Sequence, residues 1–238
     1  MYSQRSAATA AAKQTVAAST IAKRQTSDMN LPNALTAARI AVTPLIAALP
    51  FFDSWTLRLV AFILFTLAAI TDYVDGMLAR SRKEETDLGR LLDPLADKAL
   101  LVGTLIPMYL LATTFPFVTV IGNVGLSAWI VAIVLGRELF MTIFRQFARR
   151  RGIVIAAIGP AKWKTGFQLM WQGSAYCWFF AATLAAAKGW SNTLWLDFAK
   201  FNGTVGTIMM SAAVVLTLYS LGLYLRSFGN VFATAPGK

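Results

Sequence analysis

Six long apolar runs constrain this chain more than any other feature of its sequence. They lie at 33–52, 56–79, 92–114, 117–145, 163–187 and 204–227. Each approaches or exceeds the roughly 20 residues that a helix needs to cross the hydrocarbon core of a bilayer. Backbone groups cannot stay unpaired in lipid, and the runs lack the alternation of barrel strands, so helices are expected. The sequence therefore predicts an all-α integral membrane protein with six transmembrane helices.

The distribution of basic residues predicts the orientation of these spans. With six spans both termini lie on one side, together with the 80–91 and 145–164 loops, where Lys and Arg are concentrated. That side is expected to be the cytoplasm of a bacterium, or the matrix if the protein is mitochondrial. The net charge of +11 favours anionic lipid headgroups and phosphorylated substrates. Six spans argue against nucleic acid as a partner.

Composition excludes several kinds of site. The chain has one cysteine and no histidine, so an intrachain disulfide, a thiolate metal site and a histidine base are excluded. Residues 1–29 are rich in Ala, Thr and Ser and contain four basic residues. This segment is predicted to be a disordered extension or a mitochondrial transit peptide. Residues 30–238 are predicted to form the membrane domain.

Acidic residues cluster at one place. Seven of the eleven lie between positions 72 and 97, on both sides of one short loop. Asp72 and Asp75 are three apart at the end of the second span, and Asp93 and Asp97 are four apart at the start of the third. Each spacing places a pair of carboxylates on one face of a helix. Single aspartates at span ends are usually solvated, but four at helical spacings indicate a site.

Four converging carboxylates repel one another unless protons or cations neutralise them, and charge within a membrane is costly. A site with only oxygen ligands suits hard cations such as Mg²⁺ or Mn²⁺ rather than zinc. Two such ions about 4 Å apart can clamp a phosphorus centre during in-line displacement. We therefore predict two divalent cations held by Asp72, Asp75, Asp93 and Asp97. Without histidine, a carboxylate is the natural general base.

These residues also form a recognisable pattern. Asp72, Asp75, Gly76, Ala79 and Arg80, followed after eight residues by Gly89, Asp93 and Asp97, match D-x2-D-G-x2-A-R-x8-G-x3-D-x3-D at every fixed position. The pattern resembles the signature of the CDP-alcohol phosphatidyltransferase family. The segment 30–39, Arg137-Glu138 and Lys162-Trp-Lys164-Thr165 are similar to its phosphatidylglycerophosphate synthase branch, although the usual Gly before the last motif is displaced to Gly159.

The resemblance implies six transmembrane helices, usually in a homodimer, around a polar cavity that opens to the cytoplasm. It implies that the first three signature aspartates ligate two metals and that Asp97 both ligates metal and acts as the general base. Binding of the CDP-lipid is assigned to the positions that complete the signature, namely Gly76, Ala79, Arg80 and Gly89. The expected donor is CDP-diacylglycerol.

The acceptor alcohol is expected to be recognised by other residues. Arg137 lies within an apolar run and needs a partner there. It is either paired with an acid such as Glu138 or part of a phosphate clamp, with Lys162 and Lys164 as further members. Thr36 and Arg39 are placed in the same layer as candidate acceptor-binding residues. Several cations near the site favour glycerol 3-phosphate, which would give phosphatidylglycerol phosphate and CMP.

Two other functions fit some of these observations. A cardiolipin synthase of the same fold would use phosphatidylglycerol as its acceptor, and a transit-like N-terminus would suit a mitochondrial version. A divalent-cation transporter could also use carboxylates, but it would place them along a pore at several depths. Here they gather at one end of two helices, and no internal repeat is visible.

Overall fold

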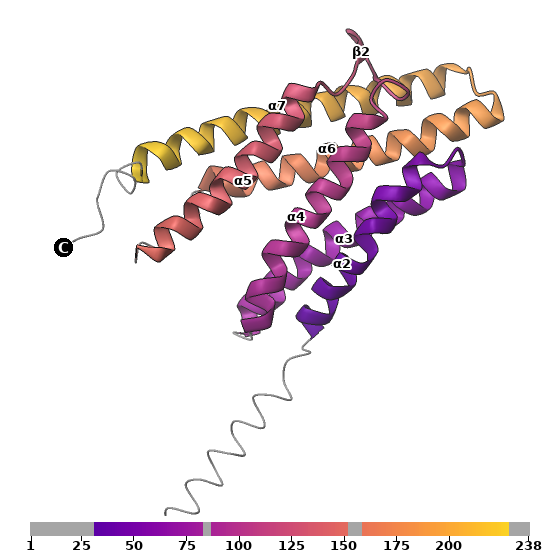
Figure 1. Ribbon diagram of the computed structural model, residues 1–238. Helices are drawn as coiled ribbons and strands as arrows, with labels where there is room; N and C mark the ends of the chain where they lie inside the picture. Colours follow the sequence, from indigo (N-terminus) through magenta and orange to yellow (C-terminus); the bar gives the residue numbers. More distant parts are fainter. Residues whose placement is uncertain (1–30, 83–86, 152–158, 229–238) are drawn as a thin grey trace, which may run out of the picture. The chain divides into compact units, whose positions relative to one another are not determined.

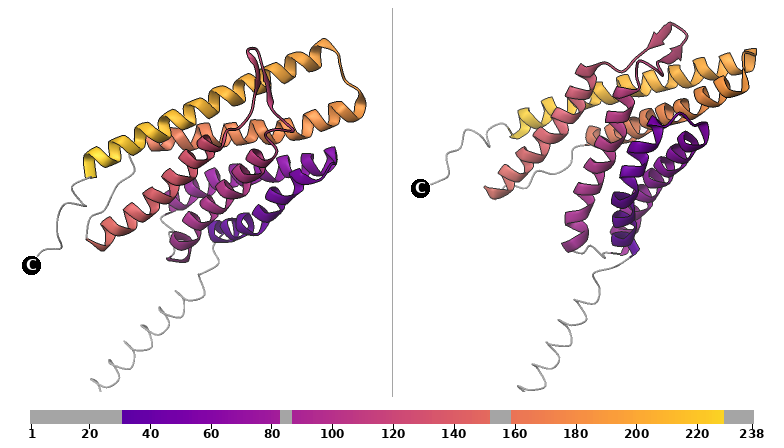
Figure 2. Two further views of the ribbon diagram at one scale, coloured as in Figure 1. Left: turned by 45° about the horizontal axis from the view of Figure 1, so that its top comes forward. Right: turned by 45° about the vertical axis from the view of Figure 1, so that its right-hand side comes forward.

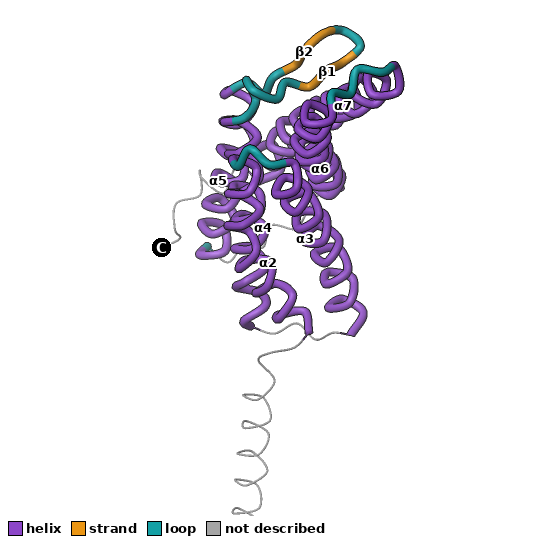
Figure 3. The backbone as a smooth tube through the Cα atoms, turned by 90° about the vertical axis from the view of Figure 1, so that its right-hand side faces the viewer, coloured by secondary structure: helices purple, strands orange, loops and turns teal. Residues whose placement is uncertain are grey.

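The computed structural model describes residues 31–82, 87–151 and 159–228, and this part of the chain is almost entirely helical (Figures 1 and 3). A 3-10 helix, η1 (Leu49–Phe51), follows α2, and two short strands, β1 (Phe117–Thr119) and β2 (Gly122–Val124), form an antiparallel hairpin. The α-helices are α2 (Leu31–Ala48), α3 (Trp55–Arg82), α4 (Asp87–Leu110), α5 (Ala128–Arg150), α6 (Gly159–Lys188) and α7 (Thr193–Phe228). The predicted all-α class is confirmed.

Three helical stretches within the described residues are long and apolar enough to cross a membrane. They are Asn33–Phe51, Trp55–Asp72 and Thr193–Ser227. The other helices, α4, α5 and α6, contain further acidic and basic residues that the sequence predicts to be at or near the site. Apolar helices of this length support an integral membrane protein. The N-terminal segment 1–29 lies outside the described residues.

The chain divides into two compact units. The first contains the start of α2 to Ala41, the end of α3 from Ile70, and the start of α4 to Ala99. The second contains the rest of these three helices together with the hairpin, α5, α6 and α7. All four signature aspartates belong to the first unit, whereas Arg137 and Lys164 belong to the second.

The run at 117–145 is not one continuous helix. Its first residues form the hairpin, and α5 starts only at Ala128. The Thr119 hydroxyl closes the turn, because it donates to the Gly122 carbonyl at 2.6 Å and accepts from the Ile121 N–H at 3.2 Å. Apolarity alone predicted a longer helix here, but local hydrogen bonds at the turn satisfy the backbone in another way.

The last helix begins earlier than the apolar run at 204–227 predicts. The Asn192 side chain accepts a hydrogen bond from the Trp195 N–H at 3.0 Å, as an N-cap does for the third helical residue. Just before it, Gly189 has a φ of 64° and ends α6. The N–H groups of Gly189 and Trp190 return to carbonyls of the last turn of α6, the Schellman arrangement. Two helix ends therefore meet across a very short turn.

Helices α6 and α7 run side by side in both views of Figure 2. The Ser174 hydroxyl donates to the Asn202 carbonyl at 3.0 Å, and the Asn202 amide donates to the Ser174 carbonyl at 3.2 Å. Gly203 on α7 allows the hairpin to approach closely, because a Cβ at this position would lie only 2.0 Å from the Val118 carbonyl oxygen. Strand β1 therefore packs directly on the backbone of α7.

Aromatic residues of α6 form the core of the second unit. Trp171 and Tyr176 are fully buried, and the Tyr176 ring stacks on Phe65 of α3 with centroids 5.4 Å apart. The Tyr176 hydroxyl donates to the Ile46 carbonyl at 3.1 Å. A buried phenol needs such a partner, because an unpaired hydroxyl in the core would cost about 1–3 kcal/mol. The contact joins α2, α3 and α6.

Arg58, in the first turn of α3, is buried. Its Nε donates to the Pro50 carbonyl at 3.0 Å, its NH1 group bonds the Thr183 hydroxyl, and its guanidinium lies 4.6 Å from the centre of the Phe115 ring. A buried cation is tolerated only when its donors are paired. Arg58 thus ties the turn between α2 and α3 to α6.

Candidate functional site

The signature aspartates lie on two helices of the first unit. Asp72 and Asp75 are in α3, and Asp93 and Asp97 are in the first turns of α4. Only positions 83–86 separate the end of α3 from the start of α4. Both helix ends belong to one compact unit. The arrangement therefore keeps the two carboxylate pairs in the same part of the molecule, as their sequence positions predicted.

Asp72 is held by an arginine from the preceding helix. The Arg39 NH1 group forms an ion pair with Asp72 Oδ1 at 2.5 Å. The Arg39 side chain is 2% exposed, whereas that of Asp72 is 39% exposed. The buried guanidinium fixes a carboxylate that keeps an accessible side. Thr36, one turn before Arg39 on α2, is buried as well.

The chemistry of the donor set fits a hard divalent cation. Asp97 is exposed and Asp72 is half-buried, so both carboxylates are accessible to an ion from solvent. The structure places Asp75 and Asp93 on their helices without describing their side chains, so the predicted four-carboxylate cluster stays a prediction. Among the described residues no group of three or more His, Cys, Asp or Glu side chains converges. Carboxylate oxygens without nitrogen or sulfur suit Mg²⁺ or Mn²⁺.

The remaining signature positions can be placed only on their helices. Gly76, Ala79 and Arg80 follow Asp75 within α3, and Gly89 lies in the first turn of α4. Their side-chain environments lie outside the described residues. The same holds for Lys162 in the first turn of α6. These assignments stay predictions.

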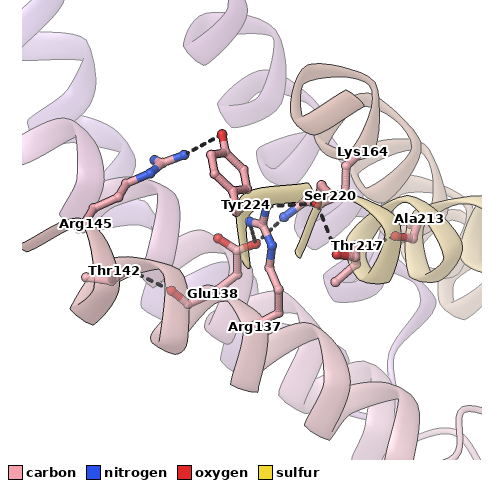
Figure 4. Close-up of polar contacts among 9 residues, drawn as sticks. All are labelled: Arg137, Glu138, Thr142, Arg145, Lys164, Ala213, Thr217, Ser220 and Tyr224. Carbon is pink, nitrogen blue, oxygen red and sulfur yellow. Dashed lines mark hydrogen bonds and ion pairs between the residues drawn. The ribbon is translucent and has the colours of Figure 1, made fainter. Parts of the chain in front are cut away.

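The second unit contains a charged cluster on α5, α6 and α7, which we call the Arg137 cluster (Figure 4). It consists of Arg137, Glu138, Lys164 and Ser220. The guanidinium donates from NH1 to Glu138 Oε1 at 2.8 Å and from NH2 to the Ser220 hydroxyl at 3.0 Å. Lys164 Nζ pairs with the same Glu138 oxygen. The side chains of Arg137 and Lys164 are each 6% exposed.

Two cations share one carboxylate in the Arg137 cluster, which leaves one formal positive charge in a buried place. The Arg137 Nε is buried and has no hydrogen-bond partner among the described residues. Leaving a buried donor unpaired costs about 1–3 kcal/mol, and more for a charged group. A small anion would satisfy both the free donor and the excess charge. The arrangement is therefore able to bind a phosphate group.

A second basic contact lies two turns further along α5. Arg145 donates to the Tyr224 hydroxyl at 3.3 Å, and its guanidinium lies 5.7 Å from the centre of the same ring. Tyr224 is buried, while Arg145 is exposed. The contact joins the ends of α5 and α7 near the Arg137 cluster. Arg145 thus adds positive charge beside the cluster without being part of it.

Of the two interpretations that the sequence left open for Arg137, the structure shows the pairing with Glu138, and the phosphate clamp stays a prediction. Lys164 pairs with the same carboxylate, which gives the proximity that a phosphate clamp requires. Ser220 was not anticipated, because α7 reads as a uniformly apolar run. Its signal was the spacing of Thr217, Ser220 and Tyr224, which places three polar groups on one face of that helix.

Comparison with known proteins gives a consistent result. A family model described as CDP-alcohol phosphatidyltransferase matches residues 29–219. The chain is 32% identical over 211 residues to CDP-diacylglycerol–glycerol-3-phosphate 3-phosphatidyltransferase 1, chloroplastic/mitochondrial, of Arabidopsis thaliana. That alignment covers 85% of this chain and 64% of the plant protein, so the chain spans slightly less than two thirds of this relative.

Two bacterial relatives are matched over more of their length. The chain is 32% identical over 205 residues to CDP-diacylglycerol–glycerol-3-phosphate 3-phosphatidyltransferase of Rickettsia bellii, covering 86% of this chain and 98% of that protein. It is 34% identical over 213 residues to a probable phosphatidylglycerophosphate synthase of Mycobacterium tuberculosis, with 87% of each chain covered. The matched family segment includes the signature aspartates and, from the Arg137 cluster, Arg137, Glu138 and Lys164, and it ends one residue before Ser220.

Proposed function

The chain belongs to the CDP-alcohol phosphatidyltransferase family, and we propose that it transfers the phosphatidyl group of CDP-diacylglycerol to glycerol 3-phosphate. The products are phosphatidylglycerol phosphate and CMP. The observation that carries the choice of acceptor is the Arg137 cluster, where a buried excess of positive charge suits a phosphate monoester. The relatives named for this reaction support the same choice.

We also propose the setting in which this reaction occurs. Residues 30–238 form one membrane domain in which α2 to α7 all span the bilayer around a polar cavity open to the cytoplasm. The basic segments on one side support this orientation. The bilayer is the bacterial inner membrane, with the mitochondrial inner membrane as the alternative, and the protein works as a homodimer among membrane lipids. Residues 1–29 form a disordered or targeting extension.

The carboxylates have two proposed roles. Asp72, Asp75, Asp93 and Asp97 would hold two divalent cations, Mg²⁺ or Mn²⁺, which when bound neutralise the diphosphate and the charge on the leaving phosphate. Asp97 accepts the proton of the attacking hydroxyl. Its exposure supports this role, because a base must be reachable by a substrate that enters from water. Arg39 orients Asp72 through their ion pair.

The bond changes follow from the two substrates. The acceptor oxygen forms a bond to the β-phosphorus, the bond from that phosphorus to the bridging oxygen breaks, and CMP leaves with the electron pair. The proton of the hydroxyl goes to Asp97. Gly76, Ala79, Arg80 and Gly89 are proposed to bind the CDP moiety, with Arg80 as the cationic member of this set.

The acceptor phosphate is proposed to bind at the Arg137 cluster. Arg137 offers its unpaired Nε, and Lys164 offers charge that Glu138 only partly balances. Lys162, two residues before Lys164 on α6, is proposed to supply a further cation. Thr36 and Arg39, which belong to the first unit, are the other residues proposed to bind the acceptor. Glu138 keeps both buried cations in place before the substrate arrives.

A direct assay tests this function. The purified protein in detergent micelles receives CDP-diacylglycerol, Mg²⁺ or Mn²⁺, and either labelled glycerol 3-phosphate or labelled phosphatidylglycerol. The expected result is CMP release that depends on glycerol 3-phosphate, with label in phosphatidylglycerol phosphate. Label incorporated only from phosphatidylglycerol would instead identify a cardiolipin synthase. No acceptor-dependent CMP release with either alcohol would refute the transferase assignment.

A further inference from the structure

A row of buried polar side chains continues from the Arg137 cluster along α6. Lys164, Gln168 and Gln172 follow one another at intervals of four residues, which places them along one side of the helix. Counted over the whole residue, their exposed fractions are 5%, 7% and 1%, respectively. Buried amides are uncommon unless they are paired, because an amide loses its hydrogen bonds to water on burial.

Neither glutamine is fully satisfied within the described part of the chain. Gln168 Oε1 and Gln172 Nε2 are buried and lack hydrogen-bond partners there. Each unpaired amide atom costs about 1–3 kcal/mol. An apolar residue of similar size would avoid that cost, so packing does not explain why glutamines occupy these positions. A ligand that supplies a hydrogen-bonding group would explain at least one of them.

The position of Gln168 relative to Lys164 indicates what that group is. Four residues of α-helix advance by about 6 Å, so Gln168 lies one turn beyond the cation and Gln172 lies two turns beyond it, about 12 Å away. The three-carbon chain of a glycerol phosphate bridges one turn but not two. A ligand whose phosphate is bound by Lys164 and Arg137 would therefore place its carbon-bound hydroxyls near Gln168.

From this geometry we infer that Gln168 recognises the C2 hydroxyl of the acceptor, an assignment that rests on the proposed function. The hydroxyl donates to the buried Gln168 Oε1 while Lys164 and Arg137 hold the phosphate. The C1 hydroxyl is then left for attack on the CDP-lipid. The ligand group at Gln168 is expected to be a hydroxyl and not a second anionic group, because the side-chain carbonyl oxygen of Gln168 would repel negative charge.

This contact would make Gln168 a specificity-determining residue. An acceptor without the C2 hydroxyl leaves the Gln168 oxygen unpaired in a buried place. Sites built to pair with a substrate hydroxyl reject analogues that lack it far more strongly than apolar pockets reject a missing methylene. For one neutral hydrogen bond and the unpaired group left behind, we expect about a tenfold to hundredfold preference in kcat/KM for glycerol 3-phosphate.

The test compares two acceptors in three proteins. Glycerol 3-phosphate and 3-hydroxypropyl phosphate share the phosphate and the primary hydroxyl and differ only in the C2 hydroxyl. The kcat/KM ratio for the two acceptors is measured for the unaltered protein, for Gln168→Leu and for Gln172→Leu. Gln172 is the matched control, because it is the same residue type on the same helix side but lies beyond reach of the acceptor.

We expect Gln168→Leu to bring the ratio close to one and Gln172→Leu to preserve it. An undiminished preference in Gln168→Leu, or an equal loss in both variants, would overturn the role of Gln168. If Gln168→Leu is not recovered folded, the kcat/KM ratio is measured for Gln168→Met, which also lacks the amide, and for Gln168→Asn, whose amide is one methylene shorter. Failure of the unaltered protein to use glycerol 3-phosphate at all would refute the proposed function instead, so the two failures are distinguishable.

Discussion

Replacement of Arg137 by alanine tests the phosphate clamp most directly. Arg137 provides one bond to Glu138, one to Ser220 and the unpaired Nε that we assign to the acceptor phosphate. A hydrogen bond to a charged group contributes about 1.5–3 kcal/mol, and each 1.4 kcal/mol is a factor of ten. We therefore expect Arg137→Ala to raise KM for glycerol 3-phosphate by about 10- to 100-fold.

The effect on folding should be small by comparison. Removal of Arg137 leaves Lys164 and Glu138 as a balanced pair, so no buried charge is stranded. The apparent KM for CDP-diacylglycerol should change little, because the signature residues of the first unit are untouched. The assay is steady-state CMP release with each substrate varied in turn, together with thermal unfolding of the purified variant.

A matched control removes an equal charge from the same helix. Arg145→Ala deletes a cation that contacts Tyr224 and is exposed to solvent, so its influence on bound phosphate is largely screened at physiological salt. We expect its KM for glycerol 3-phosphate to stay within about threefold of the unaltered protein. Equal increases in both KM values for Arg137→Ala, or equal effects of the two variants, would refute the clamp and indicate a structural role.

Three further predictions follow from other contacts. Asp97→Asn should abolish turnover with unchanged thermal unfolding, and a variant with normal kcat would show that another group accepts the proton. Glu138→Gln should destabilise the protein by about 3–5 kcal/mol, since it strands both cations of the cluster; unaltered thermal unfolding in detergent would contradict this. Gly203→Ala should lower the unfolding temperature, because the added Cβ would overlap the Val118 carbonyl. The control Gly222→Ala, whose added Cβ would have no neighbouring atom within 4 Å, should leave the unfolding temperature unchanged.

The carboxylate signature was readable from sequence because its chemistry is local to two helix ends. Asp72 and Asp75, and Asp93 and Asp97, share faces through helical spacing alone, and the short loop between the helices keeps the pairs near each other. Nothing in that pattern predicts that Arg39 pairs with Asp72, since the two residues are 33 positions apart. That contact depends on how α2 packs beside α3.

Helix boundaries show the limits of reading apolar runs. Hydrophobicity predicts where a segment can be buried, but hydrogen bonds at the ends decide where a helix starts. Thr119 closes a hairpin inside the run at 117–145, and Asn192 starts α7 well before the run at 204–227. The Asn192 cap was a recognisable signal, whereas the hairpin also depends on the close approach to Gly203.

The sequence by itself determined the helical membrane class, the family and the carboxylate signature, because each rests on residue type and spacing along one or two neighbouring segments. Only the tertiary structure decided that Arg137 and Lys164, from two helices, share the Glu138 carboxylate, and that Ser220 of a third helix accepts a hydrogen bond from Arg137. It also decided which polar atoms stay unpaired there. Such contacts depend on how helices far apart in the chain pack, and helical periodicity carries no information about the partner a buried face will meet.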